Sequence, residues 1–180
     1  ICGAYTYINN TTYYNLDNTE YELLNNTYGT ANVINMYMVN SIIHGGSSAI
    51  GVAPTPGGSL WVMMRNNADT TVYAHEMGHF FGLLHTHGYS NSVKSDEFVD
   101  GSNCHEAGDY FCDTPADPRL SPAIVNGATV NAQCLYFGNL KDGHYQTYVP
   151  DATNIMSYAP AKCLSHFSAD QLAYMNWVYI

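Results

Sequence analysis

Three histidines between residues 75 and 85 are spaced so that they could bind one metal ion. This stretch reads HEMGHFFGLLH. On a helix, His75 and His79 lie about one turn apart, so both imidazoles project from one face and can hold one metal ion. Glu76 is not needed as a ligand and can take a proton from a water molecule beside the metal. The alternative is a chance pattern on a helix whose histidines pack in the core.

Gly82 and His85 extend the pattern and favour the metal site. Gly82 follows His79 by three residues, and His85 follows Gly82 by three. A helix continued past residue 82 would carry His85 away from the metal, whereas glycine can adopt the left-handed conformation that turns the chain back. Three protein ligands leave one position open for water, as a catalytic zinc requires. The other histidines lack such spacing, and for His87 a supporting role beside the site is an alternative to an ordinary hydrogen-bonding one.

Two apolar segments and two helices are expected to position these residues. Residues 32–43 and 59–65 are rich in β-branched and apolar side chains and are predicted to be strands. A helix is predicted to begin at an N-cap within residues 69–71 and to end at Gly82. Ser168 and Gln171 form a capping box that predicts a C-terminal helix.

The segment between these helices has little regular secondary structure. Residues 86–153 are dominated by Gly, Asn, Asp, Ser and Pro, and only short strands such as residues 132–137 are expected there. A segment this long without regular structure needs other constraints, and three of the five cysteines lie inside it. Five cysteines without a CxxC pair indicate disulfides and an oxidising compartment.

Composition narrows the class of protein. A chain of 180 residues that is 46% hydrophobic can form one domain with a sizeable core. The formal charge of -10 argues against nucleic acid and anionic membrane surfaces as partners, and favours peptide-like or cationic ones. The sequence has no apolar run near the ~20 residues that a membrane span needs.

Taken together, the motifs resemble those of the metzincin zinc metallopeptidases. The long zinc motif is followed far downstream by NIMSY, in which Met156 would form the methionine turn. Three features are similar to the pappalysin family within that clan: CDTP from Cys112 to Pro115, a cysteine seven residues after Met156, and FSADQ before the last helix. The resemblance covers roughly residues 32–180.

The resemblance implies an α+β fold in a single catalytic domain, residues 1–180. An α/β-type upper subdomain, about residues 1–85, would hold a twisted mixed β-sheet and the active-site helix. An irregular lower subdomain tied by disulfides, about residues 86–180, would end in the C-terminal helix. The edge strand of the upper subdomain would bind substrate backbone, and Ser59, Leu60, Trp61 and Val62 occupy the matching place.

The same resemblance assigns roles to residues near the methionine turn. Met156 would lie under the metal as a structural residue, and the Tyr158 hydroxyl would stabilise the oxyanion, with an ordinary core tyrosine as the alternative. Lys162 would wall the pocket for the side chain after the cut and favour acidic or polar residues there, unless it points into solvent.

The family pattern also implies two disulfides, Cys104 with Cys134 and Cys112 with Cys163. Cys2 is then left over, as a free thiol or as the partner of another segment or chain. A structural calcium ion is a further expectation, because hard oxygen donors cluster at residues 96–103 and at Asp109, Asp113, Thr114 and Asp117. The alternative for these residues is a solvated acidic loop.

The sequence therefore predicts a secreted, extracellular zinc endopeptidase that acts on protein or peptide substrates. A zinc-bound water would attack the peptide carbonyl, with Glu76 as general base and then general acid. The alternative from another class is a catalytically inert, zinc-stabilised extracellular binding module. A zinc hydrolase that acts on another kind of bond is a third possibility. We also expect a removable pro-segment, by the resemblance, and a monomer.

Overall fold

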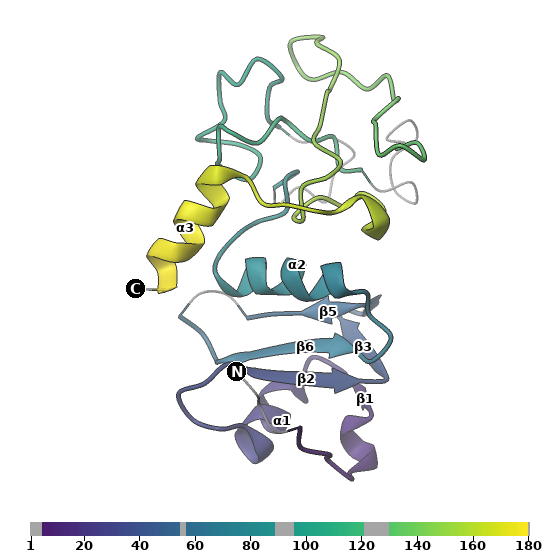
Figure 1. The fold of residues 1–180 in the computed structure, drawn as a ribbon, viewed down its shortest axis with the longest axis vertical. Helices are drawn as coiled ribbons and strands as arrows, with labels where there is room; N and C mark the ends of the chain where they lie inside the picture. The colour runs from purple at the N-terminus through teal and green to yellow at the C-terminus, as the bar shows by residue number, and fades with distance from the viewer. Residues whose placement is uncertain (1–4, 55–56, 89–95, 121–129, 180) are drawn as a thin grey trace. The chain divides into compact units, whose positions relative to one another are not determined.

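The structure, a computed structural model, describes residues 5–54, 57–88, 96–120 and 130–179, and it is a mixed α+β protein (Figure 1). The chain divides into two compact units, residues 1–68 (unit 1) and residues 69–180 (unit 2). Within the described residues, no helix combines the length and apolarity that crossing a membrane requires. Cys2 lies outside the described residues, so its predicted role is not addressed by the structure.

Unit 1 contains two small sheets and one helix. The sheet with strand order β1-β3-β4 is formed by β1 (Asn15–Leu16), β3 (Ser41–His44) and β4 (Ser47–Ala49). The sheet with order β2-β6-β5 is formed by β2 (Asn35–Val39), β6 (Trp61–Arg65) and β5 (Gly51–Val52). The short 3-10 helix η1 (Thr11–Tyr13) precedes β1, and the helix α1 (Tyr21–Tyr28) follows it.

The single strand predicted over residues 32–43 is wrong, because the segment forms two strands in different sheets. β2 pairs in parallel with β6, whereas β3 pairs in parallel with β1 and antiparallel with β4. Asn40 separates them, and its N–H donates to the carbonyl of Tyr14. Apolar content alone predicts an extended chain, but it does not show where the chain changes its pairing partner.

The prediction that residues 59–64 form an edge strand is also wrong. β6 is the central strand of its sheet, paired along its length with β2 and through Met63 and Met64 with β5. Residues 61–64 are all buried, as is typical of a strand covered on both faces. The Leu60 carbonyl accepts from Asn35 N–H, and Trp61 Nε1 donates to Glu22. Met63 and Met64 are therefore paired on both sides, whereas peptide binding at Ser59, Leu60, Trp61 and Val62 stays a prediction, because β5 does not extend to them.

Apolar side chains from both sheets and α1 form the core of unit 1. Its largest fully buried members include Leu16, Leu24, Ile42 and Met63. Each such side chain stabilises the fold by about 1.5–3 kcal/mol relative to an exposed one. Tyr21 packs in the same cluster and donates its hydroxyl hydrogen to the Ile43 carbonyl at 2.7 Å.

Unit 2 has two long helices joined mainly by loops (Figure 1). α2 (Thr70–Phe80) is capped by Asp69, whose side chain accepts from Thr71 N–H, so the predicted N-terminus is confirmed. After α2, the described residues up to 160 contain isolated β-bridges and no helix or longer strand. The expected strand at residues 132–137 is reduced to one such bridge, between Val130 and Tyr136.

The predicted C-terminal helix is α3 (Ala169–Tyr179), and its capping box is confirmed. Ser168 N–H donates to Gln171 Oε1 at 2.9 Å, and Gln171 N–H donates to Ser168 Oγ at 3.1 Å. Gln171 Oε1 also accepts from Asn154 Nδ2 at 2.9 Å. The cap therefore joins α3 to the turn that contains Met156.

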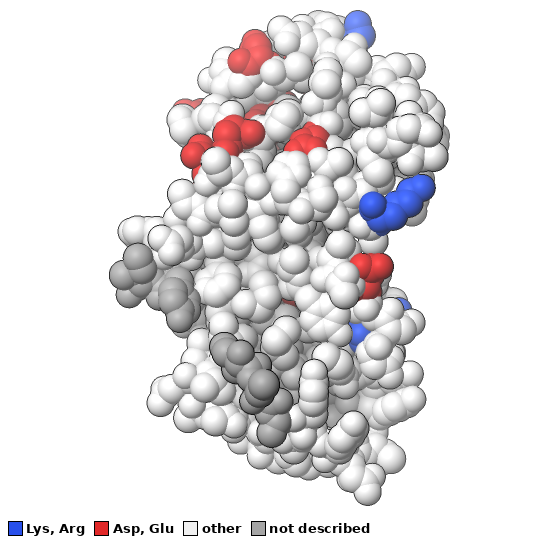
Figure 2. All heavy atoms as spheres, viewed as in Figure 1, with Lys and Arg blue, Asp and Glu red and all other residues white. Residues whose placement is uncertain are grey.

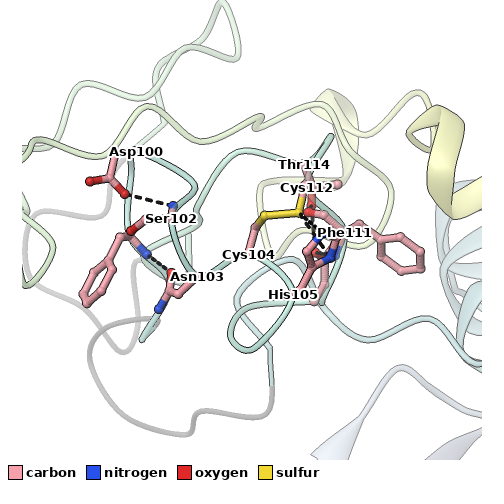
Figure 3. The surroundings of a disulfide bond; sticks show 10 residues. Asp100, Ser102, Asn103, Cys104, His105, Phe111, Cys112 and Thr114 are labelled. Carbon is pink, nitrogen blue, oxygen red and sulfur yellow. Dashed lines mark hydrogen bonds between the residues drawn. A yellow bond between two sulfur atoms is a disulfide. The ribbon is translucent and has the colours of Figure 1, made fainter.

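The predicted disulfide pairing is wrong. Cys104 is bonded to Cys112 (Figure 3), and Cys134 is bonded to Cys163 in the 3-10 helix η2 (Ala161–Cys163). Successive turns bring Cys104 and Cys112 to a Cα separation of 5.1 Å, and the other pair lies 5.4 Å apart. Both separations suit a disulfide, and each sulfur forms only one. Spacing along the chain carries no information about such turns, so it could not choose between pairings.

Acidic side chains outnumber basic ones on the visible surface. Figure 2 shows several Asp and Glu side chains gathered over the loops of unit 2, with few Lys or Arg side chains on the same face. This distribution follows the formal charge of -10. A basic side chain in such a chain is therefore unusual enough to be considered individually.

Candidate metal centre

α2 positions two of the three predicted ligands. His75 and His79 are one turn apart on this helix, and their ring centroids are 4.7 Å apart. Their Nδ1 atoms lie 2.7 Å from the Ile155 carbonyl oxygen and 2.8 Å from the Leu83 carbonyl oxygen, respectively. A carbonyl oxygen can only accept, so each Nδ1 carries the hydrogen and each Nε2 presents its lone pair.

Gly82 brings in the third ligand, as the sequence predicts. Gly82 has a φ of 94°, a left-handed conformation that glycine adopts without strain. Gly82 N–H donates to the His79 carbonyl, and Leu83 N–H donates to the Gly78 carbonyl. These two bonds are the Schellman motif, which ends a helix and redirects the chain. His85 is thereby returned to the face that carries His75 and His79.

The three imidazoles converge through their Nε2 atoms. His79 Nε2 lies 3.1 Å from His75 Nε2 and 3.0 Å from His85 Nε2. Bonds of ~2.0–2.1 Å to a tetrahedral zinc ion place ligand nitrogens roughly 3.3 Å apart. Converging lone pairs repel one another unless they share a cation, so the donor set fits a metal ion. The described residues thus bring together the predicted group of His75, His79 and His85.

The surroundings keep these imidazoles in the neutral form that binds metal. Burial lowers the pKa of His75, and burial with the neighbouring His75 lowers the pKa of His79 to about 4. The pKa of His85 is also lowered well below its usual value, mainly by burial. Metal binding therefore needs no displacement of protons at neutral pH.

Glu76 lies on α2 directly after the first ligand and is 7% exposed. Burial raises its pKa to about 8. A cation at the three histidines would favour the ionised carboxylate and so oppose this shift. Its position and its buried setting suit a group that exchanges a proton with a nearby water molecule.

Met156 packs directly against α2. It is fully buried, and a Cβ added at Gly78 would lie 2.5 Å from its sulfur. Gly78 therefore allows the close approach of the methionine turn, a role that was not predicted from the sequence. The turn also supplies backbone contacts, because the Ile155 carbonyl binds His75 and the Met156 carbonyl accepts from Thr86 N–H.

Tyr158 lies beside the histidines and is 36% exposed. Its ring centroid is 4.3 Å from that of His85 and 6.4 Å from that of His75. Burial raises the pKa of its hydroxyl, while the nearby Arg119 charge acts in the opposite direction. The neutral hydroxyl is thus retained as a hydrogen-bond donor.

His87 and Arg119 also lie next to the Tyr158 ring. His87 is 4% exposed and stacks on His85, with ring centroids 5.0 Å apart. Burial, followed by the Arg119 charge, lowers the pKa of His87 to about 3. The Arg119 guanidinium lies 5.6 Å from the Tyr158 ring centroid. Arg119 was not predicted as a site residue, because no sequence spacing links it to the zinc motif.

Asp117 connects the segments that carry the site. It is 1% exposed, and its carboxylate accepts from Thr86 Oγ1, Ser157 Oγ and Arg119 N–H. Thr86 follows His85, and Ser157 precedes Tyr158, so one carboxylate joins the ligand loop to the methionine turn. The sequence places Asp117 among the oxygen donors expected for calcium, whereas its hydrogen bonds in the structure tie loops together.

The other calcium candidates are also bonded to protein donors. Asp113 accepts from Ser168 Oγ and Asp170 N–H at the start of α3, each at 2.8 Å. Asp109 accepts from Thr114 Oγ1 and from Gln171 Nε2. Lys162, which was predicted to wall a substrate pocket and not to bind calcium, lies in η2 and is exposed.

Over part of its length the chain is similar to known extracellular metalloproteases. No protein-family model matches the chain. An extracellular metalloprotease of the fungus Arthroderma benhamiae is 30% identical over 124 residues, which make up 69% of this chain and 33% of the relative. The extracellular metalloproteases of Trichophyton verrucosum and Arthroderma gypseum match with the same identity and coverage. The chain spans about a third of the length of these relatives, and over the matched part it is similar to fungal extracellular metalloproteases.

Proposed function

We propose that the chain is the catalytic region of a secreted zinc metalloendopeptidase. The convergence of the Nε2 atoms of His75, His79 and His85 carries the proposal. Three neutral imidazoles with hydrogens on the opposite nitrogens are a donor set for zinc that leaves a position open. The similarity to extracellular metalloproteases and the two disulfides support secretion and peptide substrates.

The residues around the ion would divide the chemistry of hydrolysis. Zinc, when bound there, supplies a Lewis acid that makes water more acidic and polarises a carbonyl group. Glu76 takes the proton from the attacking water and gives it to the leaving amine. The Tyr158 hydroxyl donates a hydrogen bond to the oxyanion that develops on the former carbonyl oxygen. Met156 binds no metal and supports α2 from below through Gly78.

The finer family assignment is part of the same proposal. The long zinc motif, the left-handed Gly82 and the buried Met156 after it support a metzincin of the pappalysin type. The assignment includes a single catalytic domain with a subdomain boundary near residue 85. It also includes a removable pro-segment and a monomeric state. Lys162 remains a candidate for the pocket that receives the side chain after the cut.

A structural calcium ion in unit 2 also remains a proposal. Three buried carboxyl groups, Glu97, Asp109 and Asp117, support it. Burial and the charges of the other two raise the pKa of Glu97 to about 8, so a cation there would be favourable. Calcium should raise the melting temperature of the zinc-loaded chain. An unchanged melting temperature at saturating calcium would contradict this part.

The decisive experiment is hydrolysis of a denatured protein by the purified, zinc-loaded chain. Glu76→Ala should retain zinc, measured by elemental analysis, while its hydrolysis falls by a factor on the order of a thousand or more. Chelated wild type should also be inactive and should recover with zinc. A wild type that holds zinc at the three histidines and cuts nothing would point to the inert binding module instead.

A further inference from the structure

Arg119 places a positive charge beside the candidate active site. Its guanidinium carbon is 5.6 Å from the centroid of the Tyr158 ring, and that ring is 4.3 Å from the His85 ring. Arg119 is partly exposed, so a bound molecule can reach it. Lys162, the basic residue singled out from the sequence, is exposed in η2.

No carboxylate of the described chain neutralises this charge. All 15 Asp and Glu residues lie in described segments, and none of them forms an ion pair with Arg119. Arg119 Nε is buried and has no hydrogen-bond partner among the described residues. A charged group without a protein partner is costly to bury, so an arginine of this kind is suited to a ligand whose acceptor atoms its exposed part can reach.

A second unsatisfied group lies next to Tyr158. His87 Nδ1 is buried and has no hydrogen-bond partner in the described part of the chain. The His87 ring centroid is 4.7 Å from that of Tyr158, which also lies next to Arg119. Two unsatisfied nitrogens thus border one tyrosine.

The backbone holds Arg119 in this position. Arg119 N–H donates to Asp117 Oδ1 at 2.7 Å, and Ser157 Oγ donates to Asp117 Oδ2 at 3.2 Å. Because Ser157 precedes Tyr158, the arginine and the tyrosine are anchored to the same buried carboxylate. Anchoring the backbone reduces the conformational freedom that the arginine loses when its side chain binds an anion.

We propose that Arg119 is a specificity-determining residue that binds a carboxylate of the peptide substrate close to the bond that is cut. A guanidinium matches a carboxylate with paired, charge-assisted hydrogen bonds, which a lysine ammonium cannot copy. The formal charge of -10 repels acidic peptides in general, so the preference must arise from this local group. The proposal rests on the proposed peptidase function, and the carboxylate is a Glu or Asp side chain or a free C-terminus.

The test uses quenched fluorescent peptides of one sequence, after mass spectrometry has located the cut. One set carries Glu, Gln or Lys on either side of the cut, and a second set ends shortly after it in a free carboxylate or an amide. Wild type should prefer the carboxylate member by about tenfold in kcat/KM, the size expected for one charge-assisted hydrogen bond. The set that shows the preference identifies the source of the carboxylate.

Substitutions test whether Arg119 causes the preference for a carboxylate. Arg119→Gln should bring the Glu-to-Gln ratio to about one while cleavage of the Gln peptide persists, and Arg119→Glu should favour Lys. Lys141→Gln, an exposed basic residue with no assigned role, is the matched control and should keep the wild-type ratio. Melting temperature and zinc content check that each variant is folded. An unchanged ratio in Arg119→Gln, or loss of the ratio in Lys162→Gln alone, would overturn the proposal.

A binding measurement separates this inference from the peptidase proposal. Fluorescence anisotropy of labelled Glu and Gln peptides on zinc-loaded Glu76→Ala should show tighter binding of the Glu peptide, and Arg119→Gln should remove the difference. If wild type cleaves nothing but this difference appears, the peptidase proposal fails and the anion site stands. Equal binding of the two peptides would refute the anion site, whatever the activity.

Discussion

Unit 1 is held together by apolar side chains between strands, whereas unit 2 buries polar and charged groups among loops. Every buried polar or charged residue of the described chain lies in unit 2, including Glu76, Glu97, Asp117 and Gln171. Burying such groups is costly unless they are hydrogen-bonded or bind a ligand. The difference shows that unit 2 buries polar groups, at a cost in desolvation, in order to hold side chains of the candidate site in place.

Removing the metal should produce the largest difference in stability between the two units. A ligand present at about a thousand times its Kd stabilises a fold by about 4 kcal/mol, and all three candidate ligands lie in unit 2. Chelation should therefore increase hydrogen exchange in peptides from residues 69–88 and 153–158, with little change in unit 1. Mass spectrometry measures this exchange, and equal changes in both units would break the contrast.

Removing the disulfides should have the second-largest effect on stability. The loop-entropy relation gives about 3.5 kcal/mol for the 29-residue separation of Cys134 and Cys163, and about 2.5 kcal/mol for the 8-residue separation of Cys104 and Cys112. Paired Cys→Ser variants should lose stability in that order in urea unfolding. Peptide mapping without reduction should recover these pairs, and recovery of Cys104 with Cys134 would restore the sequence-based pairing.

Asp117→Asn tests whether hydrogen-bonded buried charge stabilises unit 2. The change leaves the size of the side chain but weakens its bonds to Thr86, Ser157 and Arg119, at a cost of about 3 kcal/mol. Chemical unfolding measures the loss. Asp170→Asn, an exposed carboxylate in α3, is the control and should change stability by less than about 0.5 kcal/mol.

Gly78→Ala tests the contact between α2 and the methionine turn. An added Cβ would meet the Met156 sulfur at 2.5 Å and Phe167 at 3.2 Å. We expect a loss of about 2 kcal/mol from overpacking, together with weaker zinc binding as His75 shifts from Ile155. Thermal melting and a zinc titration measure the two effects. Unchanged zinc affinity would show that the turn does not position the ligand.

The smallest expected effect, taken over one pH unit, is a pH dependence of stability from Glu97. The native pKa is about 8, against an ordinary value of 4.5, because of burial and the charges of Asp109 and Asp117. Between these values the native state holds a proton that the unfolded chain releases, so stability falls as pH rises from about 5 to 8. Without divalent cations, Glu97→Gln should reduce this slope, by on the order of 1 kcal/mol per pH unit, in melts across that range. The exposed Glu106→Gln is the control.

Local signals could be read from the sequence because each depends on neighbouring residues. Asp69 as N-cap, the Ser168 and Gln171 capping box and the left-handed Gly82 are all present in the structure. Each is a short-range device in which one side chain or one φ angle satisfies groups within a few residues. The pairing of strands was not predictable, because it depends on contacts between distant segments. The pairing of cysteines was not predictable either, because it depends on how the intervening loops turn.

By itself, the sequence determined the types and order of the candidate ligands and the helix ends that present them, since helical period and capping act over a few residues. Only the tertiary structure decided that β6 is a central strand, which cysteines are bonded, and that Asp117 and Arg119 lie beside Ser157 and Tyr158. The contact between Asp117 and Ser157 joins residues 40 positions apart, and the free energy of all these contacts depends on packing and desolvation that no local pattern records.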